Sequence, residues 1–311
     1  MHKLAPICLF VYNRFNETKL TIGSLKNNFL AQQSDLIIFS DGIKNESNFD
    51  AVMDVRRFIK SITGFKSIII YESDLNKGLA QSIIDGVTLV LNQYDKIIVL
   101  EDDLITTPNF LDFMNQGLDY FNNNTRIYSI NGYSPYIGKV NSDSFLHARS
   151  FPWGWGTWRK QWDKDIFQET KFKKSMTTDL LNQFSVDCGE DAKRMLLDSL
   201  KGQNDSWYIK WVYNNYVQDN LSVFPIYSKI INIGFTSLDN THCKYISAYE
   251  HRLDIYNCTN FTFKNIYSLQ KDDRRFLKYF TKKHKLKYRL RLMFKKGGLL
   301  LLFNELKNRF L

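Results

Sequence analysis

Cysteine is scarce in this chain of 311 residues, which contains only four copies. They are far apart and form no CxxC pair, which argues against a zinc site and provides no disulfide framework. Cys8 lies within an apolar run and is most simply a thiol of the core. We therefore expect a cytosolic protein with reduced thiols.

Glycine-rich phosphate-binding motifs are also missing. No GxGxxG follows the first apolar run, and GxxxxGK[ST] occurs nowhere in the sequence. This excludes the dinucleotide fingerprint and the P-loop. A bound nucleotide would have to be held by side chains and a metal ion instead of a glycine cradle.

Long hydrophobic runs are absent as well. No segment reaches the apolar length that a membrane-spanning helix needs. The apolar run near the N-terminus is too short for a signal peptide and lacks a small-residue cleavage site. We expect neither a spanning helix nor a secretory leader.

Acidic residues are almost missing from the C-terminal part. Residues 274–311 contain thirteen Lys and Arg against Glu305 alone. Since the whole chain carries +10 and this segment +12, residues 1–273 carry −2. Leucine and aromatic residues alternate with the basic ones, which predicts an amphipathic helical tail over residues 265–311 that binds an anionic membrane surface. No nucleic-acid-binding fold is recognisable there, so nucleic acid is the less favoured partner.

The first third of the chain alternates between strand-like and helix-like patterns. Uniformly apolar runs predict buried strands, and each of the first three is followed by an amphipathic stretch. Such alternation favours an α/β fold with a Rossmann-type, mostly parallel sheet flanked by helices. The predicted strands are 6–12, 35–40, 67–71 and 97–100, and the predicted helices are 17–28, 50–61 and 79–92.

Polar residues follow each predicted strand. Asn13 and Arg14 follow the first, Asp41 the second, and Asn76 and Lys77 the third. The fourth ends in the consecutive acids Glu101, Asp102 and Asp103. The carboxyl ends of parallel strands share one edge, where open α/β folds bind ligands. Oxygen ligands favour Mg²⁺ or Mn²⁺, although an isolated acidic triplet can also be a solvated turn.

Six stretches together resemble GT-A glycosyltransferases, in particular the bacterial family with N-acetylglucosaminyltransferase I-like catalytic domains. The resemblance covers roughly residues 5–245 and places a catalytic domain at 1–264. The matching stretches are PICLFVYNR, NKGL, LEDDL with a following Pro and Phe, WGWGTWRKQW, DSWYIKW and NIGF with NTH at residues 240–242.

The resemblance implies a role for each of these strand-end residues. In a D-x-D-like motif, Asp103 would bind the metal, and Glu101 and Asp102 would face the donor sugar or ribose. Asp41 would accept from a pyrimidine N–H, although an Asp before Gly is more often a turn residue. Arg14, with the Asn76–Lys77 loop, would lie at the nucleotide.

His242 would complete the metal shell or contact the diphosphate, or it is an ordinary loop residue. An inverting transfer also needs a base. Asp205 precedes two tryptophans that would desolvate its carboxylate, although it would serve equally as a helix N-cap. Ser206, Glu190 and Asp191 remain alternatives.

The tryptophan block allows two interpretations. Trp153, Trp155 and Trp158 would stack on sugar faces, and Trp162 would belong to the core, since aromatic clusters are more often packing.

The sequence therefore predicts a metal-dependent, inverting hexosyl- or N-acetylhexosaminyltransferase. Its donor would be a UDP-linked sugar, its acceptor a glycan or lipid-linked glycan, and its place the inner face of the cell membrane. The alternatives are a sugar-nucleotidyltransferase and an inactive sugar-binding or membrane-adaptor domain.

Overall fold

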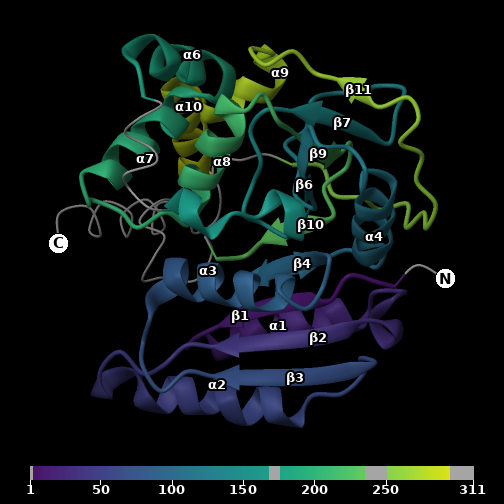
Figure 1. Ribbon diagram of the computed structural model, residues 1–311, viewed down its shortest axis with the longest axis vertical. Coiled ribbons are helices and arrows are strands. Elements are labelled where there is room, and N and C mark those ends of the chain that lie inside the picture. The colour runs from purple at the N-terminus through teal and green to yellow at the C-terminus, as the bar shows by residue number, and fades with distance from the viewer. Residues whose placement is uncertain (1–2, 168–175, 235–250, 295–311) are drawn as a thin grey trace.

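The computed structural model describes residues 3–167, 176–234 and 251–294. Within these residues the protein is a mixed α/β structure around a nine-stranded sheet (Figure 1). Its strands are β1 (Ile7–Val11), β2 (Asp35–Ser40), β3 (Ser67–Glu72), β4 (Lys96–Glu101), β6 (Ile127–Asn131), β7 (Ser144–His147), β8 (Trp155–Trp158), β9 (Leu221–Pro225) and β11 (Tyr267–Ser268).

The strand order is β11-β7-β9-β6-β8-β4-β1-β2-β3. β1 pairs in parallel with both β2 and β4, and β2 pairs in parallel with β3. β8 runs antiparallel to both β4 and β6, so β4 and β6 point the same way. β9 is parallel to β6. The carboxyl ends of β1, β2, β3, β4, β6 and β9 therefore share one edge of the sheet.

Helices cover both faces of the sheet. α1, α2 and α4 pack on the face that contains Ile7 and Leu9 of β1. α3, α6, α7 and α8 pack on the opposite face, which contains Cys8 and Phe10. The helices are α1 (Phe15–Lys26), α2 (Phe49–Ser61), α3 (Gly78–Leu91), α4 (Phe110–Tyr120), α6 (Thr178–Cys188), α7 (Glu190–Leu200), α8 (Trp207–Val217), α9 (Arg274–Leu277) and α10 (Lys282–Met293).

The predicted α/β class is confirmed, and the predicted strands and helices of the first third lie within a few residues of the observed ones. β1 and β4 are buried on both faces, which explains why their sequences are apolar throughout instead of alternating. Arg14 occupies the N-cap position of α1 and makes no side-chain cap bond.

Among the strands that the sequence did not predict, β8 and β5 bear on the site. β8 comes from the tryptophan block and lies in the middle of the sheet, between β4 and β6. β5 (Leu104–Thr106) follows the acidic triplet directly and pairs with β10 (Ile230–Asn232) in a separate two-stranded sheet. The β5–β10 pair therefore lies directly after the turn that carries the acids.

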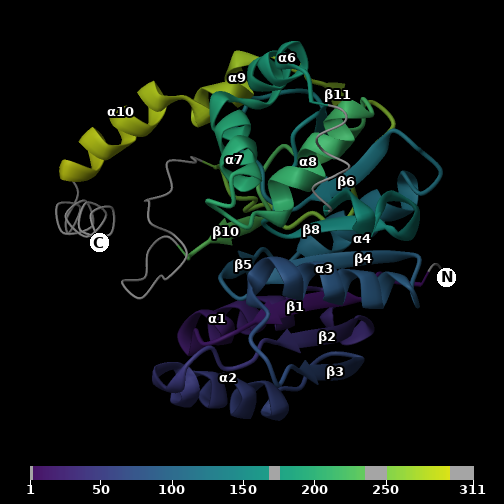
Figure 2. The same cartoon turned by 60° about the vertical axis from the view of Figure 1, so that its left-hand side comes forward.

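The C-terminal region begins as part of the body. β11 pairs with β7, and the side chains of Phe276, Tyr279 and Phe280 are at most 2% exposed. The segment predicted as a tail from residue 265 therefore starts with packed structure. α10 follows and extends away from the body (Figure 2).

No helix among the described residues is both long enough and apolar enough to cross a membrane.

Candidate functional site

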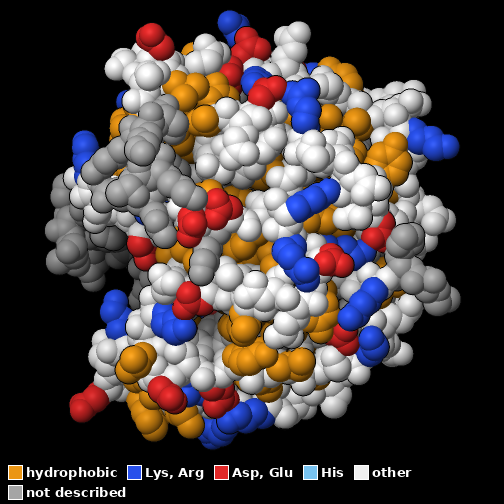
Figure 3. Space-filling model, viewed as in Figure 1, with side chains coloured by type: hydrophobic (Ala, Val, Ile, Leu, Met, Phe, Trp, Pro, Cys, Tyr) orange, Lys and Arg blue, Asp and Glu red, His pale blue; other side chains and the backbone are white. Residues whose placement is uncertain are grey.

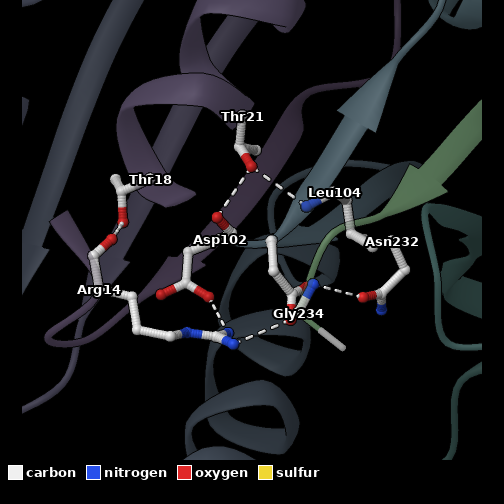
Figure 4. Close-up of polar contacts among 8 residues, drawn as sticks. Arg14, Thr18, Thr21, Asp102, Leu104, Asn232 and Gly234 are labelled. Atoms are coloured by element: carbon white, nitrogen blue, oxygen red, sulfur yellow. Dashed lines mark hydrogen bonds and ion pairs between the residues drawn. The ribbon is translucent and has the colours of Figure 1, made fainter. Parts of the chain in front are cut away.

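The acidic triplet forms a buried turn that is held from two sides. The Thr21 hydroxyl on α1 donates to the carbonyl of Asp102 (2.8 Å) and accepts from the amide of Leu104 (3.1 Å; Figure 4). On the other side, the Ile233 amide donates to the carbonyl of Asp103 (2.9 Å). The turn is therefore fixed before any ligand binds, as an ion-binding or catalytic centre requires.

Arg14 lies against these acids. Its Nη1 donates to Oδ2 of Asp103 (2.9 Å), and its Nη2 donates to Oδ1 of Asp102. Both aspartates are almost completely buried, at 3% and 4% exposed. The structure thus brings Arg14 to the predicted site, but as an ion-pair partner of the two aspartates.

The three carboxylates carry more negative charge than Arg14 neutralises. Burial, reinforced by Asp103 and Asp102, raises the pKa of Glu101 to about 8, although Arg14 opposes the shift. Burial likewise raises the pKa of Asp102 to about 6, and it raises the pKa of Asp103. A second cation at this turn would relieve the repulsion that raises these pKa values.

Two observations bear on whether a divalent cation fits here. Oδ1 of Asp103 is buried and accepts no hydrogen bond from the residues that the structure describes. Gly234 lies against the same carboxylate, and a Cβ at Gly234 would come within 2.0 Å of Oδ2 of Asp103. One carboxylate oxygen, Oδ1, is therefore unused by the described residues, and only a glycine at position 234 lets Oδ2 keep its place beside the backbone.

Across the described ranges, no three His, Cys, Asp or Glu side chains converge as a ready-made metal cage. Mg²⁺ commonly binds through one or two carboxylates together with substrate phosphates. A site of that kind needs no cage, and Asp103 is the residue that would hold the ion.

Asp41 is saturated by hydrogen bonds from the chain itself. Its Oδ1 accepts from the amides of Gly42 and Lys77 (both 2.9 Å). Its Oδ2 accepts from Nδ2 of Asn76 and the amide of Gly78 (both 3.0 Å). Since a carboxylate offers about four lone-pair sites, none is left for a pyrimidine N–H. In this structure Asp41 anchors the Asn76–Lys77 loop at the start of α3, and a base contact would require one bond to be exchanged.

A cavity of about 250 Å³ lies beside this loop and includes Asp41 and Lys77 in its wall. Phe39 and Tyr71 stack with ring centroids 5.2 Å apart and line it together with α3. Hydrophobic side chains are exposed over this lower part of the molecule, where β2 and β3 lie (Figure 3). The cavity provides a flat aromatic surface next to the sheet edge that carries the acids.

The expected desolvation of Asp205 is wrong, because its side chain is exposed. Asp205 does not cap α8 either, since the hydroxyl of Ser206 accepts from the amide of Ile209 (3.4 Å). Among the alternatives, Asp191 forms a buried bidentate ion pair with Arg149 (2.9 and 3.1 Å), which indicates a structural role. Glu190 is exposed on the first turn of α7.

The stacking prediction for Trp155 and Trp158 is wrong. Both are core residues at 0% and 1% exposed, and the Trp158 indole N–H donates to the Leu118 carbonyl (3.0 Å). Trp162 belongs to the core as predicted, whereas Trp153 is partly buried against Tyr133. His242 lies outside the described residues.

Sequence reasoning missed Thr21 and the specific role of Gly234. Thr21 is a fully buried polar residue on the apolar face of α1, four positions before Leu25. A polar residue in that stripe needs a hydrogen-bond partner, and this was the available signal. Gly234 belongs to the NIGF stretch, but only the structure shows which atom its missing Cβ would strike.

Comparison with known proteins adds little to this geometry. No protein-family model and no curated protein matches the sequence. A mannosyltransferase from Pyrobaculum calidifontis, solved with GDP-Man and Mn²⁺, is similar over 50% of this chain and 45% of its own, with 7% identity and a TM-score of 0.34. S. aureus TarS (residues 1–349) is similar over 53% and 49%, with 8% identity and a TM-score of 0.32. Each match spans about half of the solved chain.

Proposed function

We propose that this chain is a metal-dependent, inverting glycosyltransferase. It would transfer a hexosyl or N-acetylhexosaminyl group from a UDP-linked donor to a hydroxyl of a glycan or lipid-linked glycan. The observation that carries the proposal is the unused, buried Oδ1 of Asp103 at the carboxyl edge of the sheet. Breaking the bond between sugar and diphosphate places negative charge on the leaving phosphate, and a bound Mn²⁺ or Mg²⁺ would stabilise that charge as a Lewis acid.

The residues around Asp103 would orient the donor. Glu101, the last residue of β4, would face a sugar or ribose hydroxyl of the donor. Arg14 would contact both the aspartates and a phosphate oxygen of the donor. His242 is the candidate for a further contact to the metal or diphosphate.

Asp205 is our candidate for the base that takes the proton of the acceptor hydroxyl. Its carboxylate is exposed, so an acceptor can reach it from solvent. No hydrogen bond or ion pair within the described part of the chain joins it to the acidic turn, so the acceptor itself would have to bridge the two. A positioned general base typically contributes a factor of 10² to 10⁴ to the rate.

Product analysis tests the proposal. The protein is incubated with UDP-sugars, Mn²⁺ and a panel of oligosaccharides, and both UDP and the elongated glycan are measured. A parallel reaction with UTP and sugar 1-phosphate measures pyrophosphate, which a sugar-nucleotidyltransferase would release. Elongated glycan with equimolar UDP supports the proposal. Pyrophosphate release, or the absence of both products in the presence of bound donor, contradicts it.

Matched variants connect the activity to the site. Asp103→Asn removes the charge that would hold the ion and should abolish transfer. Asp95→Asn is the control, because Asp95 lies just before the opposite end of the same strand and is 87% exposed. It should leave transfer unchanged.

We also propose that α10 holds the enzyme at an anionic membrane surface. Leu286, Leu290 and Met293 recur at helical spacing on α10 and are 58%, 51% and 45% exposed. Lys282, Lys283 and Lys287 are exposed on the same helix. Basic residues near an anionic surface contribute about 1 kcal/mol each, and exposed apolar side chains add a component that resists salt.

Liposome co-sedimentation tests the membrane proposal. Truncation after Thr281 removes α10 but keeps the buried Phe276, Tyr279 and Phe280, so the body should stay folded. The full chain should sediment with anionic but not neutral liposomes, and the truncated chain with neither. Equal sedimentation of both proteins would contradict the proposal.

A further inference from the structure

A cluster of three tyrosines surrounds an exposed arginine on the second half of the molecule. The guanidinium carbon of Arg252 lies 5.4 Å from the ring centroid of Tyr227 and 5.7 Å from that of Tyr136. Tyr227 in turn packs against Tyr256, with ring centroids 5.5 Å apart. Tyr256 is 58% exposed, and Arg252 is exposed as well. We call these residues the tyrosine–arginine cluster.

The cluster lies at the same edge of the sheet as the acidic turn. Tyr136 follows the carboxyl end of β6, and Tyr227 follows that of β9. Both strands point the same way as β4, which ends at the acids, and they lie two and three positions from β4 in the sheet. At a spacing of about 4.8 Å between strands, the carboxyl ends of β6 and β9 are roughly 10–15 Å from that of β4 along this edge.

Backbone hydrogen bonds hold the cluster in place. The Ser228 amide donates to the Arg252 carbonyl (2.8 Å), and the Asp254 amide donates to the Ser228 carbonyl (2.9 Å). Beneath them, Lys229 and Asp254 form a buried ion pair, and Asn109 donates to Oδ2 of Asp254 (2.9 Å). The exposed rings and guanidinium are therefore presented on a rigid base, which lowers the entropic cost of binding a ligand.

The chemistry of the cluster suits a sugar that bears a negative charge. Within the described ranges, Arg252 has no carboxylate partner, and its guanidinium lies over the rings of Tyr136 and Tyr227. A guanidinium binds carboxylate and phosphate oxygens through two parallel hydrogen bonds. Tyrosine rings offer apolar faces together with a hydroxyl group, and the apolar C–H faces of a pyranose pack on such rings.

We infer that the tyrosine–arginine cluster binds the acceptor and selects an acidic glycan, one that carries a carboxylate or a phosphodiester. This inference rests on the proposed function, because it takes the acceptor to be a glycan. An acceptor bound there would extend along the carboxyl edge of the sheet toward the acidic turn. The anionic group would lie on Arg252, at a distance of a few sugar units from the reacting hydroxyl.

Direct binding tests the inference without any donor or turnover. Three oligosaccharides of matched length are titrated by calorimetry: tetragalacturonate, a phosphodiester-linked hexose tetramer, and neutral maltotetraose. At least one acidic oligomer should bind more tightly than the neutral one, and the comparison of the two acidic oligomers identifies the anionic group. Arg252→Gln should weaken the acidic ligand on the order of tenfold to a hundredfold, the usual range for a charge-assisted hydrogen bond. Tyr256→Ala should weaken it by roughly two- to tenfold.

Two control variants are matched to these. Arg126→Gln changes an exposed arginine at the amino end of β6, which is the opposite edge of the sheet. Tyr120→Ala changes a tyrosine that is 51% exposed on α4. Neither should alter binding.

Equal affinity for acidic and neutral oligomers, or an equal loss in Arg126→Gln, would overturn the inference. Tighter binding of a single-stranded oligonucleotide through Arg252 would also overturn it. Failure of the proposed function is distinguishable, because acidic oligomers would then still bind the cluster although no UDP-sugar is consumed.

Discussion

The substitution Gly234→Ala tests whether the space beside Asp103 is part of the site. The new Cβ would lie 2.0 Å from Oδ2 of Asp103, whereas an ordinary contact is 3.4–4 Å. The carboxylate would have to rotate away, and it would lose its 2.9 Å hydrogen bond from Arg14. Overpacking of this kind costs about 1–3 kcal/mol.

Two measurements follow on the same protein. Urea unfolding should show the free energy of unfolding of Gly234→Ala lowered by about 1–3 kcal/mol. Calorimetry should show that Mn²⁺ no longer increases the affinity for UDP, because the displaced carboxylate cannot hold the ion.

Gly23→Ala is the matched control, since Gly23 lies within α1 and, beyond the neighbouring backbone of that helix, no heavy atom of the described residues lies within 4 Å of the added Cβ. It should raise stability by about 0.5–1 kcal/mol and leave binding unchanged. If Gly234→Ala keeps both the stability and the metal effect of the wild type, the described geometry of the turn is wrong.

Three further outcomes are expected. Because the folded pKa values of Glu101 and Asp102 are raised to about 8 and 6, the folded state binds more protons than the unfolded state between about pH 4 and 8. Thermal stability in EDTA should therefore fall as the pH rises through that range, and it should fall less in Glu101→Gln. Identical pH profiles of the wild type and Glu101→Gln would refute this. Asp205→Asn should lower the transfer rate on the order of 10² to 10⁴ with UDP affinity unchanged, whereas Ser206→Ala should cost about 0.5–2 kcal/mol of stability with little effect on the rate. If Asp205→Asn instead lowers stability and Ser206→Ala instead lowers the rate, the roles of the two residues are exchanged. Phe276→Ala should cost about 3–5 kcal/mol, because this ring is fully buried and stacks on His147 at 3.9 Å, and a melting curve equal to that of the wild type would show that the C-terminal segment is not part of the core.

The first third of the fold was predictable because its strands are local and apolar throughout. β1 and β4 are buried on both faces, so their uniform hydrophobic runs indicate a parallel sheet. The acids at the end of β4 followed from the same pattern, since the carboxyl ends of parallel strands meet at one edge.

The second half was less predictable because its pairings are distant in sequence. β8 inserts between β4 and β6, which places Trp155 and Trp158 inside the sheet instead of on a sugar-binding surface. Their aromatic character is equally compatible with both locations, and only the strand order decides between them.

Polar side chains posed a different difficulty. A strand-end Asp such as Asp41 has the same sequence pattern whether it binds a ligand or the amides of its own loop. Similarly, Asp205 and Ser206 are adjacent, and the backbone alone determines that Ser206 caps α8 and Asp205 faces solvent.

The most direct test of the central claim is a calorimetric titration of UDP into the full chain with and without Mn²⁺. We predict that UDP binds measurably more tightly when Mn²⁺ is present, and that Asp103→Asn removes this difference while its unfolding transition remains cooperative. A wild-type affinity for UDP that does not change with Mn²⁺ would contradict the assignment of Asp103 and, with it, the proposed mechanism.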